Sequence, residues 1–229
     1  MMTAFTTMDW IALSFFLFGW LIFEIINDYS PMRFKSLSSI MARRRREWML
    51  EMAERDLRMI DTQIMQGLQN GAAYFGSACI LAIGGCFALL GATDKVLEIY
   101  RDLPVAIEVP RLLFELRVFG LVTIVVYAFF KFGWAYRLFN YCSILMGAVP
   151  MCDRSDAETR KKAALESAEM NIIASRHFNA GLRGMFFALG YLGWFINPTT
   201  LICSTLFVMA VLTRRNYFSA ARRIVADDI

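Results

Sequence analysis

A few charged side chains lie inside apolar runs, and they are the places where this sequence could do chemistry. Lys131 and Arg137 lie inside the apolar run of residues 115–150, and Glu24 is the only charge in the run of residues 10–26. A charge at membrane depth is costly, so it normally faces a protein interior, a water-filled cavity or a headgroup layer. These residues therefore predict either ion pairing or a hydrated polar site.

An ion pair between Glu24 and Lys131 is the arrangement we expect. At 1.5 Å per residue, Glu24 lies about 22 Å beyond Asp9, and Lys131 lies about 21 Å beyond Arg117. The two helices run in the same direction, so both charges fall at a similar depth, and either one alone in hydrocarbon would be costly. The alternatives are that Lys131 extends to the interface while Glu24 reaches water, or that the pair has a transport role.

Amides and further cations extend these charges into a predicted polar cluster at the inner membrane face, which consists of Glu24, Asn27, Lys131, Arg137, Asn140, Asn179 and Arg183. A stripe of polar residues every four positions shares one helix face with part of this cluster: Asn171, Ser175, Asn179 and Arg183. Such a cluster could line the vestibule of a channel or transporter. We favour the other interpretation, in which these groups form hydrogen bonds between helices at a wet interface.

Four consecutive arginines, Arg43, Arg44, Arg45 and Arg46, follow the first apolar run. Near an anionic membrane surface, each such charge contributes about 1 kcal/mol of attraction. We therefore expect contacts with anionic lipid headgroups; the alternative is a solvated helix face that controls orientation. Because acidic residues follow closely and the run adjoins a membrane span, we expect no binding of nucleic acid.

Patterns typical of catalysis or metal binding do not occur in this sequence. We find no nucleophile–base spacing, no phosphate-binding glycine loop and no metal-ligand spacing. The single histidine, His177, excludes an all-histidine metal site, and the five cysteines form no CxxC pair. We therefore expect no enzymatic activity, no metal ion and no cofactor.

The composition indicates that membrane helices position these residues. The chain has 229 residues, of which 58% are hydrophobic, and its mean hydropathy is +0.47. Soluble domains contain about 45–50% apolar residues. The fold class that we predict is all-α, an integral membrane helical bundle of about five transmembrane helices with long cytoplasmic helical extensions. It forms one membrane domain over residues 1–229.

Apolar runs divide the chain into spans and extensions. The predicted spans are 9–27, 70–92, 116–141, 180–196 and 199–213, and the predicted cytoplasmic extensions are 41–69 and 155–179. Apolar positions at helical spacing, without an intervening proline, predict one helix of roughly 75 Å over residues 41–91. Residues 155–158 match a capping box, which predicts the start of a helix that continues to Asn197-Pro198.

Residues 184–212 decide the number of spans. As one helix they would measure roughly 43 Å, longer than a bilayer core of about 30 Å, and Asn197-Pro198 disfavours helix near their middle. Two helices joined by a tight turn put the arginine-rich tail on the same side as the eight basic residues of 28–69. We predict five spans, with the N-terminus outside and the C-terminus in the cytoplasm. Four spans is the alternative.

Two stretches resemble an uncharacterised family of bacterial multi-pass membrane proteins with plant relatives, which is known only as a domain of unknown function. They are RRRREWMLEMAERDLRMIDTQIMQGLQNGAAYFGSACILAIGG, residues 43–85, and YAFFKFGWAYRLFNYCSILMGAVP, residues 127–150. Weaker similarity occurs in HFNAGLR, residues 177–183, and in WFINP. The resemblance implies an integral membrane protein of the bacterial inner cell membrane, and it supplies no activity or site residues.

The function that these patterns favour is non-enzymatic. Apolar stripes on the predicted extensions indicate assembly, so we predict an accessory or scaffold subunit, or a homo-oligomer. Its partners would be the lipid bilayer with its anionic headgroups and either a second copy of the chain or another membrane protein. The alternative is a channel or transporter for a small solute or ion that uses the polar cluster.

Overall fold

The described part of the chain is helical. The computed structural model describes residues 5–29, 36–101 and 109–226, and these ranges contain no strand. The α-helices are α1 Thr7–Tyr29, α2 Leu37–Ala53, α3 Met59–Gly91, α4 Thr93–Arg101, α5 Arg111–Ala148, α6 Ala157–Tyr191, α7 Pro198–Tyr217 and α8 Ala220–Ala226. A 3-10 helix, η2 Leu192–Phe195, joins α6 to α7. The all-α prediction is confirmed.

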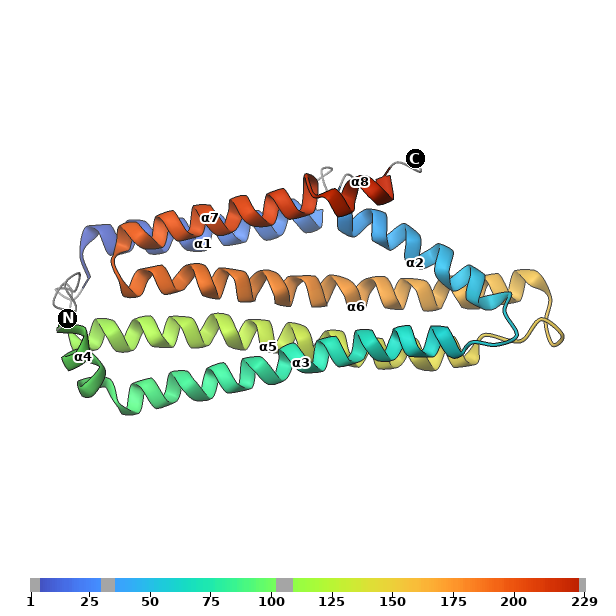
Figure 1. Ribbon diagram of the computed structural model, residues 1–229, viewed down its shortest axis with the longest axis horizontal. Helices are drawn as coiled ribbons and strands as arrows, with labels where there is room; N and C mark the ends of the chain where they lie inside the picture. The colour runs from blue at the N-terminus through green and yellow to red at the C-terminus, as the bar shows by residue number, and fades with distance from the viewer. Residues whose placement is uncertain (1–4, 30–35, 102–108, 227–229) are drawn as a thin grey trace.

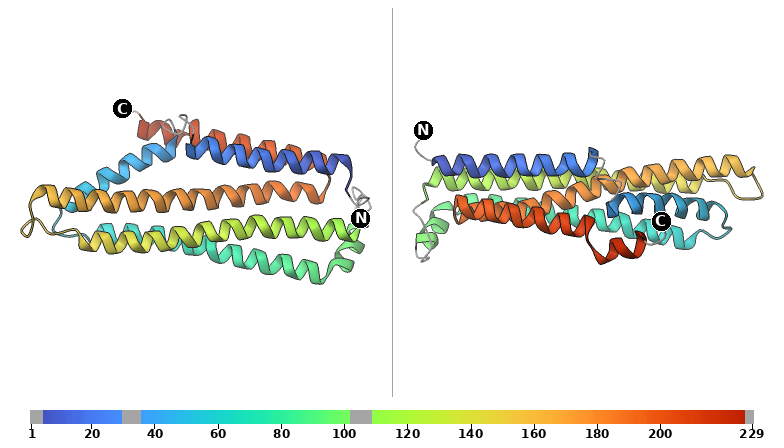
Figure 2. Two further views of the ribbon diagram at one scale, coloured as in Figure 1. Left: turned by 180° about the vertical axis from the view of Figure 1, so that it is seen from behind. Right: turned by 90° about the horizontal axis from the view of Figure 1, so that it is seen from above.

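Three long helices run the length of the molecule. They are α3, α5 and α6, with 33, 38 and 35 residues (Figure 1). Helices α1 and α7 lie side by side along one half of this length, and α2 lies along the other half, as two further views also show (Figure 2). We call the half with α1 and α7 the apolar half, and the half with α2 the polar half.

The apolar half carries apolar side chains on its inside and on its outside. Inside, Phe16 and Phe187 are fully buried, and the Tyr191 ring lies 5.3 Å from that of Phe16. On the outside, Leu81 is 77% exposed and Phe207 is 69% exposed. A helix that is apolar all round is typical of a membrane span.

Three helices are long and apolar enough to cross a membrane, judged by length and composition. They cover Thr7–Asn27, Met59–Gly91 and Arg111–Ala148. These helices indicate a membrane protein.

A buried ion pair lies at the end of the apolar half where the chain begins. Arg117 Nη2 lies 3.3 Å from Asp9 Oδ1, and the two side chains are 5% and 3% exposed. Trp194 donates its indole N–H to the same carboxylate oxygen at 2.8 Å. Asp9 lies on α1, Arg117 on α5 and Trp194 on η2, so these contacts join the three elements. Separating the elements would leave a buried charge without its partner, which is costly.

The predicted single helix over residues 41–91 is wrong. Helix α2 ends at Ala53, and α3 begins at Met59 after a reversal of the chain. Buried Asp61 accepts hydrogen bonds from Trp48 Nε1 at 2.7 Å and from Arg55 Nη1 at 3.2 Å. These contacts favour the reversal although no proline or glycine marks it. The predicted extension 41–69 therefore consists of two helices that run in opposite directions.

The turn at Asn197-Pro198 and the start of α6 lie close to where the sequence predicts them. Asn197 caps α7, with its side-chain oxygen 2.7 Å from the N–H of Thr200, and Pro198 occupies the first helical position. The cap of α6 is Asp156, whose carboxylate accepts from the N–H of Thr159 at 2.9 Å. It lies one residue beyond the predicted capping serine.

Candidate functional site

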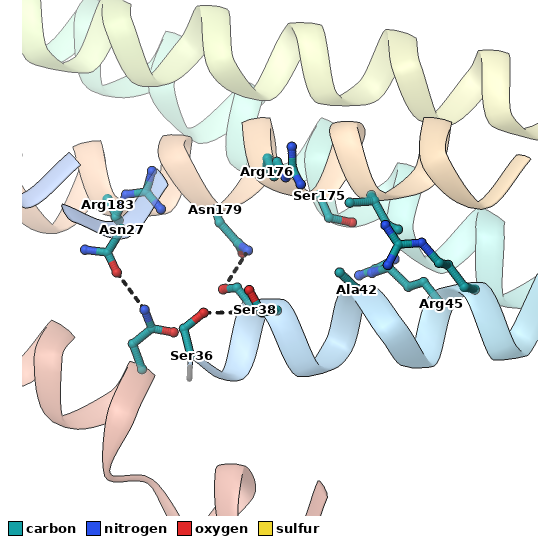
Figure 3. A pocket seen from close by; sticks show the side chains of 13 residues that line it. Asn27, Ser36, Ser38, Ala42, Arg45, Ser175, Arg176, Asn179 and Arg183 are labelled. Carbon is teal, nitrogen blue, oxygen red and sulfur yellow. Dashed lines mark hydrogen bonds between the residues drawn. The ribbon is translucent and has the colours of Figure 1, made fainter. Parts of the chain in front are cut away.

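A cavity of about 210 Å³ lies where the apolar half meets the polar half. We call it the junction cavity. Its lining comes from the end of α1, the start of α2, the middle of α6 and the end of α7 (Figure 3). The lining residues are Asn27, Ser36, Ser38, Ser39, Ala42, Arg45, Arg46, Ile172, Ser175, Arg176, Asn179, Arg183 and Asn216. Guanidinium, hydroxyl and amide groups therefore dominate its wall.

Helix α6 supplies the polar stripe that the spacing of four residues predicts. Asn179 donates from Nδ2 to Ser38 Oγ at 3.5 Å, which joins α6 to the first turn of α2 (Figure 3). Asn171 is fully buried and accepts a hydrogen bond at Oδ1 from Arg45. The stripe therefore faces α1 and α2, and three of its members, Ser175, Asn179 and Arg183, line the junction cavity directly.

Glu24 pairs with Arg183 and not with Lys131. Arg183 donates to Glu24 Oε2 from Nε at 3.0 Å and also from Nη2, and the side chains are 13% and 16% exposed. The ammonium of Lys131 lies 5.3 Å from the centre of the Tyr127 ring. The predicted Glu24–Lys131 pair is therefore wrong. Helix α6 packs against both α1 and α5, so its guanidinium reaches the carboxylate, and an arginine can donate twice to it.

Glu24 and Lys131 nevertheless lie at a similar level along the bundle. Trp20 lies one helical turn before Glu24, and Tyr127 lies one turn before Lys131. The rings of Trp20 and Tyr127 are 5.2 Å apart. Glu24 and Lys131 thus lie at a similar level along the bundle but contact different residues.

Asn27 is the third member of the predicted cluster that lies at the cavity. Its Oδ1 accepts from Asn216 Nδ2 at 2.6 Å, and its Nδ2 donates to the carbonyl oxygen of Phe23 at 2.8 Å. The bond to Asn216 joins the ends of α1 and α7 (Figure 3).

The remaining predicted cluster members lie on α5, outside the cavity lining. Arg137 is exposed and donates from Nε to the hydroxyl of Tyr141 at 2.7 Å. Asn140 accepts at Oδ1 from Gln69 Nε2 at 2.9 Å, which joins α5 to α3. The predicted cluster therefore separates into a group at the cavity and a group on α5.

The arginine run has contacts within the protein. Arg43 and Arg44 lie 3.4 Å and 2.9 Å from the carboxylate of Glu47 on their own helix. Arg45 and Arg46 point to α6 instead, where Arg46 lies 2.6 Å from Glu169. Burial lowers the pKa of the Arg45 guanidinium from its ordinary value. Contact of the run with lipid headgroups stays a prediction.

Arg176 differs from the other three arginines at the cavity. Among the described residues, Arg183 pairs with Glu24 and Arg46 with Glu169, whereas Arg176 is exposed and has neither a hydrogen bond nor an ion pair. Its guanidinium is therefore available to a ligand that enters the cavity. Guanidinium groups bind carboxylates and phosphates through parallel hydrogen bonds.

Anion binding is the chemistry that the cavity supports best. Among the described residues, those that line the cavity carry no carboxylate, imidazole, thiol or ammonium group. The first turn of α2 also lines it, and the N-terminus of a helix favours negative charge. Elsewhere in the described residues, no three His, Cys, Asp or Glu side chains group in a way that could hold a metal ion.

Several lining residues are absent from the predicted cluster. Arg176 follows Ser175 directly and could have been found by widening the stripe on α6 by one position. Ser38 and Asn216 could not, because they reach the cavity only through the packing of α2 and α7 against α1 and α6.

Comparison with curated proteins finds no match, and comparison with solved structures finds none either. A family model described as "Protein of unknown function, DUF599" matches residues 11–221. That range is most of the chain, and it confirms the resemblance to an uncharacterised family. This match over most of the chain identifies the protein as a member of the DUF599 family of unknown function.

Proposed function

We propose that this chain is a non-enzymatic, multi-pass membrane protein that binds an anionic group in the junction cavity. The observation that carries this proposal is the guanidinium of Arg176, which has no ion pair among the described residues. The other arginines that line the cavity, Arg45, Arg46 and Arg183, each contact a side chain of the protein. Arginine stays protonated at physiological pH, so it donates hydrogen bonds without acting as a general base. Binding therefore suits this lining better than catalysis does.

Five spans fit the arrangement of the apolar half. The three apolar helices would span at residues 9–27, 70–92 and 116–141, and residues 180–196 and 199–213 of the α6–α7 hairpin lie beside them. Helix α7 has 20 residues, or about 30 Å, which matches the hydrocarbon thickness of a bilayer. The polar half would then lie in the cytoplasm of a bacterial cell, beneath the inner membrane, with the N-terminus outside.

A channel or transporter is the second candidate, and the position of the cavity at the edge of the apolar half favours it. The packing at the centre of the apolar half argues against a channel or transporter. Between the cavity and the Asp9–Arg117 pair, the rings of Phe16, Phe187 and Tyr191 pack against one another. Transport through one copy would require these rings to separate. Uptake of radiolabelled phosphate into proteoliposomes, absent in protein-free liposomes, would favour this candidate.

Assembly into a homo-oligomer or as a scaffold subunit belongs to the proposal too. At the end of the polar half, Leu57, Met59 and Ile60 are 79%, 70% and 56% exposed, and exposed apolar patches are typical of contact surfaces. Native mass spectrometry of mildly solubilised protein should detect more than one copy or a co-purifying membrane protein. A uniform monomer without partners would contradict this part of the proposal.

Anion binding can be tested with inorganic phosphate on the purified full chain. Phosphate should raise the melting temperature at constant ionic strength, because a ligand that binds only the folded state stabilises it. Arg176→Gln should weaken this binding roughly tenfold or more, through loss of charge-assisted hydrogen bonds. Arg137→Gln is the matched control, since Arg137 is an exposed arginine away from the cavity. Equal phosphate affinity in wild type and Arg176→Gln would overturn the proposal.

A further inference from the structure

An apolar groove adjoins the junction cavity. It encloses about 170 Å³ and shares five lining residues with the cavity: Asn27, Ser38, Asn179, Arg183 and Asn216. Its other lining residues are mostly apolar: Phe23, Leu37, Leu182, Phe186, Leu212 and Arg215. The two spaces thus form one site that is cationic at one end and apolar at the other.

On three helices, the apolar residues of the groove lie to the same side of the polar residues that the groove shares with the cavity. On α1, Phe23 precedes Asn27 by one helical turn, and on α7, Leu212 precedes Asn216 by one turn. On α6, which runs in the opposite direction, Phe186 follows Asn179 by about two turns. In each helix the apolar residue is therefore the one nearer the centre of the apolar half. The site changes from cationic to apolar along the long axis of the molecule.

We propose that this combined site holds a lipid whose phosphate headgroup carries a net negative charge, a proposal that rests on the proposed function. The phosphate would lie among Arg176, Arg183 and the hydroxyl groups of α2. The acyl chain would lie along the groove toward the apolar half. Phosphate accepts paired hydrogen bonds from guanidinium groups, and an acyl chain gains by burial against Phe186 and Leu212.

Arg215 also lines the groove and places a cation beside its aromatic lining. The guanidinium carbon lies 5.4 Å from the centre of the Phe186 ring. Arginine with aromatic rings is typical of the boundary between hydrocarbon and headgroups. Free phosphate would use the cationic end alone, whereas a lipid would use both ends.

The test compares three probes on the detergent-solubilised full chain: short-chain phosphatidic acid, short-chain phosphatidylcholine and inorganic phosphate. Wild type should bind the phosphatidic acid at least roughly tenfold more tightly than either of the other probes. Inorganic phosphate has no acyl chain to bury in the groove, and the choline of phosphatidylcholine brings a positive charge to the arginines of the cavity. Arg176→Gln should weaken the binding of both phosphatidic acid and inorganic phosphate.

A groove variant separates the lipid from free phosphate. Leu212→Gln should weaken the binding of phosphatidic acid at least roughly threefold, which corresponds to the loss of about one buried methylene group. The affinity for inorganic phosphate should stay unchanged. Leu206→Gln is the matched control, since Leu206 lies on the same helix and is 51% exposed. Leu182→Gln provides a second groove variant if Leu212→Gln does not fold.

The results of these binding experiments distinguish failure of the lipid inference from failure of the proposed anion binding. Equal affinity for phosphatidic acid and inorganic phosphate would overturn the lipid inference but not the proposed anion binding. Equal affinity for phosphatidic acid and phosphatidylcholine would also overturn the lipid inference. Groove variants that bind phosphatidic acid like wild type also overturn it. If none of the phosphate-bearing probes binds, both the inference and the proposed function fail.

Discussion

Glu24 and Arg183 are mostly buried charges at the boundary between the two halves, and each depends on the other. Glu24→Gln removes the carboxylate and leaves the guanidinium with weaker acceptors, at a cost of about 1–3 kcal/mol of unfolding free energy. Arg183→Gln should cost a similar amount. The double variant should cost less than the sum of the two, because the interaction can be lost only once. Denaturant unfolding in detergent measures all three.

Lys131→Met is the control for this pair, since the Lys131 ammonium lies against Tyr127 and not against Glu24. Its effect should add to that of Glu24→Gln without coupling. Strictly additive Glu24 and Arg183 variants, or coupling between Glu24 and Lys131, would contradict the arrangement.

Cys142 and Cys152 should react differently although both lie near the polar half. Cys142 is fully buried, whereas Cys152 is exposed, and a thiol must be accessible to react. At pH 7.5 a maleimide should label Cys152 and leave Cys142 unmodified until the protein unfolds. Mass spectrometry of the peptides distinguishes the two sites. Equal labelling rates in the folded protein would contradict the burial of Cys142.

At the scale of elements, the reversal between α2 and α3 depends on buried Asp61. Asp61→Ala would leave the indole N–H of Trp48 without its acceptor, at a cost of about 1–3 kcal/mol. The turn should then open more often, and trypsin should cleave after Arg55 and Arg58 faster. Asp56→Ala is the matched control, because Asp56 is an exposed aspartate in the same turn. Equal cleavage in the two variants would show that Asp61 does not hold the turn.

The elements that the sequence predicts well are those whose signals are local. Asn197-Pro198 caps and starts α7 by itself, and the acidic residue at position 156 starts α6. The α2–α3 turn has no such signal, because residues 54–58 are ordinary helix formers and the turn depends on Asp61 and Trp48 coming together. For the same reason, the four-residue spacing on α6 predicts the polar stripe but cannot show that Glu24 meets Arg183.

At the scale of the whole molecule, the two halves determine where a ligand can be recognised. The apolar half has packed rings inside and apolar side chains outside. In the polar half, paired arginines and glutamates join α2 to α6. The junction cavity lies between them, so its cations meet the end of the apolar half. A site at this level suits a molecule that has both a charged and an apolar part.

Five spans would put the loop before α6 and the tail after α7 on one side of the membrane. The contact between α8 and α2 supports this, since α2 belongs to the polar half as the loop does. In a variant series with one cysteine each, Cys152 and Ala220→Cys should be protected together from an impermeant maleimide in right-side-out spheroplasts. Lys95→Cys, at the opposite end of the molecule, should be labelled. Permeabilisation should expose the two protected sites, which controls for burial. Labelling of Ala220→Cys together with Lys95→Cys in intact spheroplasts would require four spans.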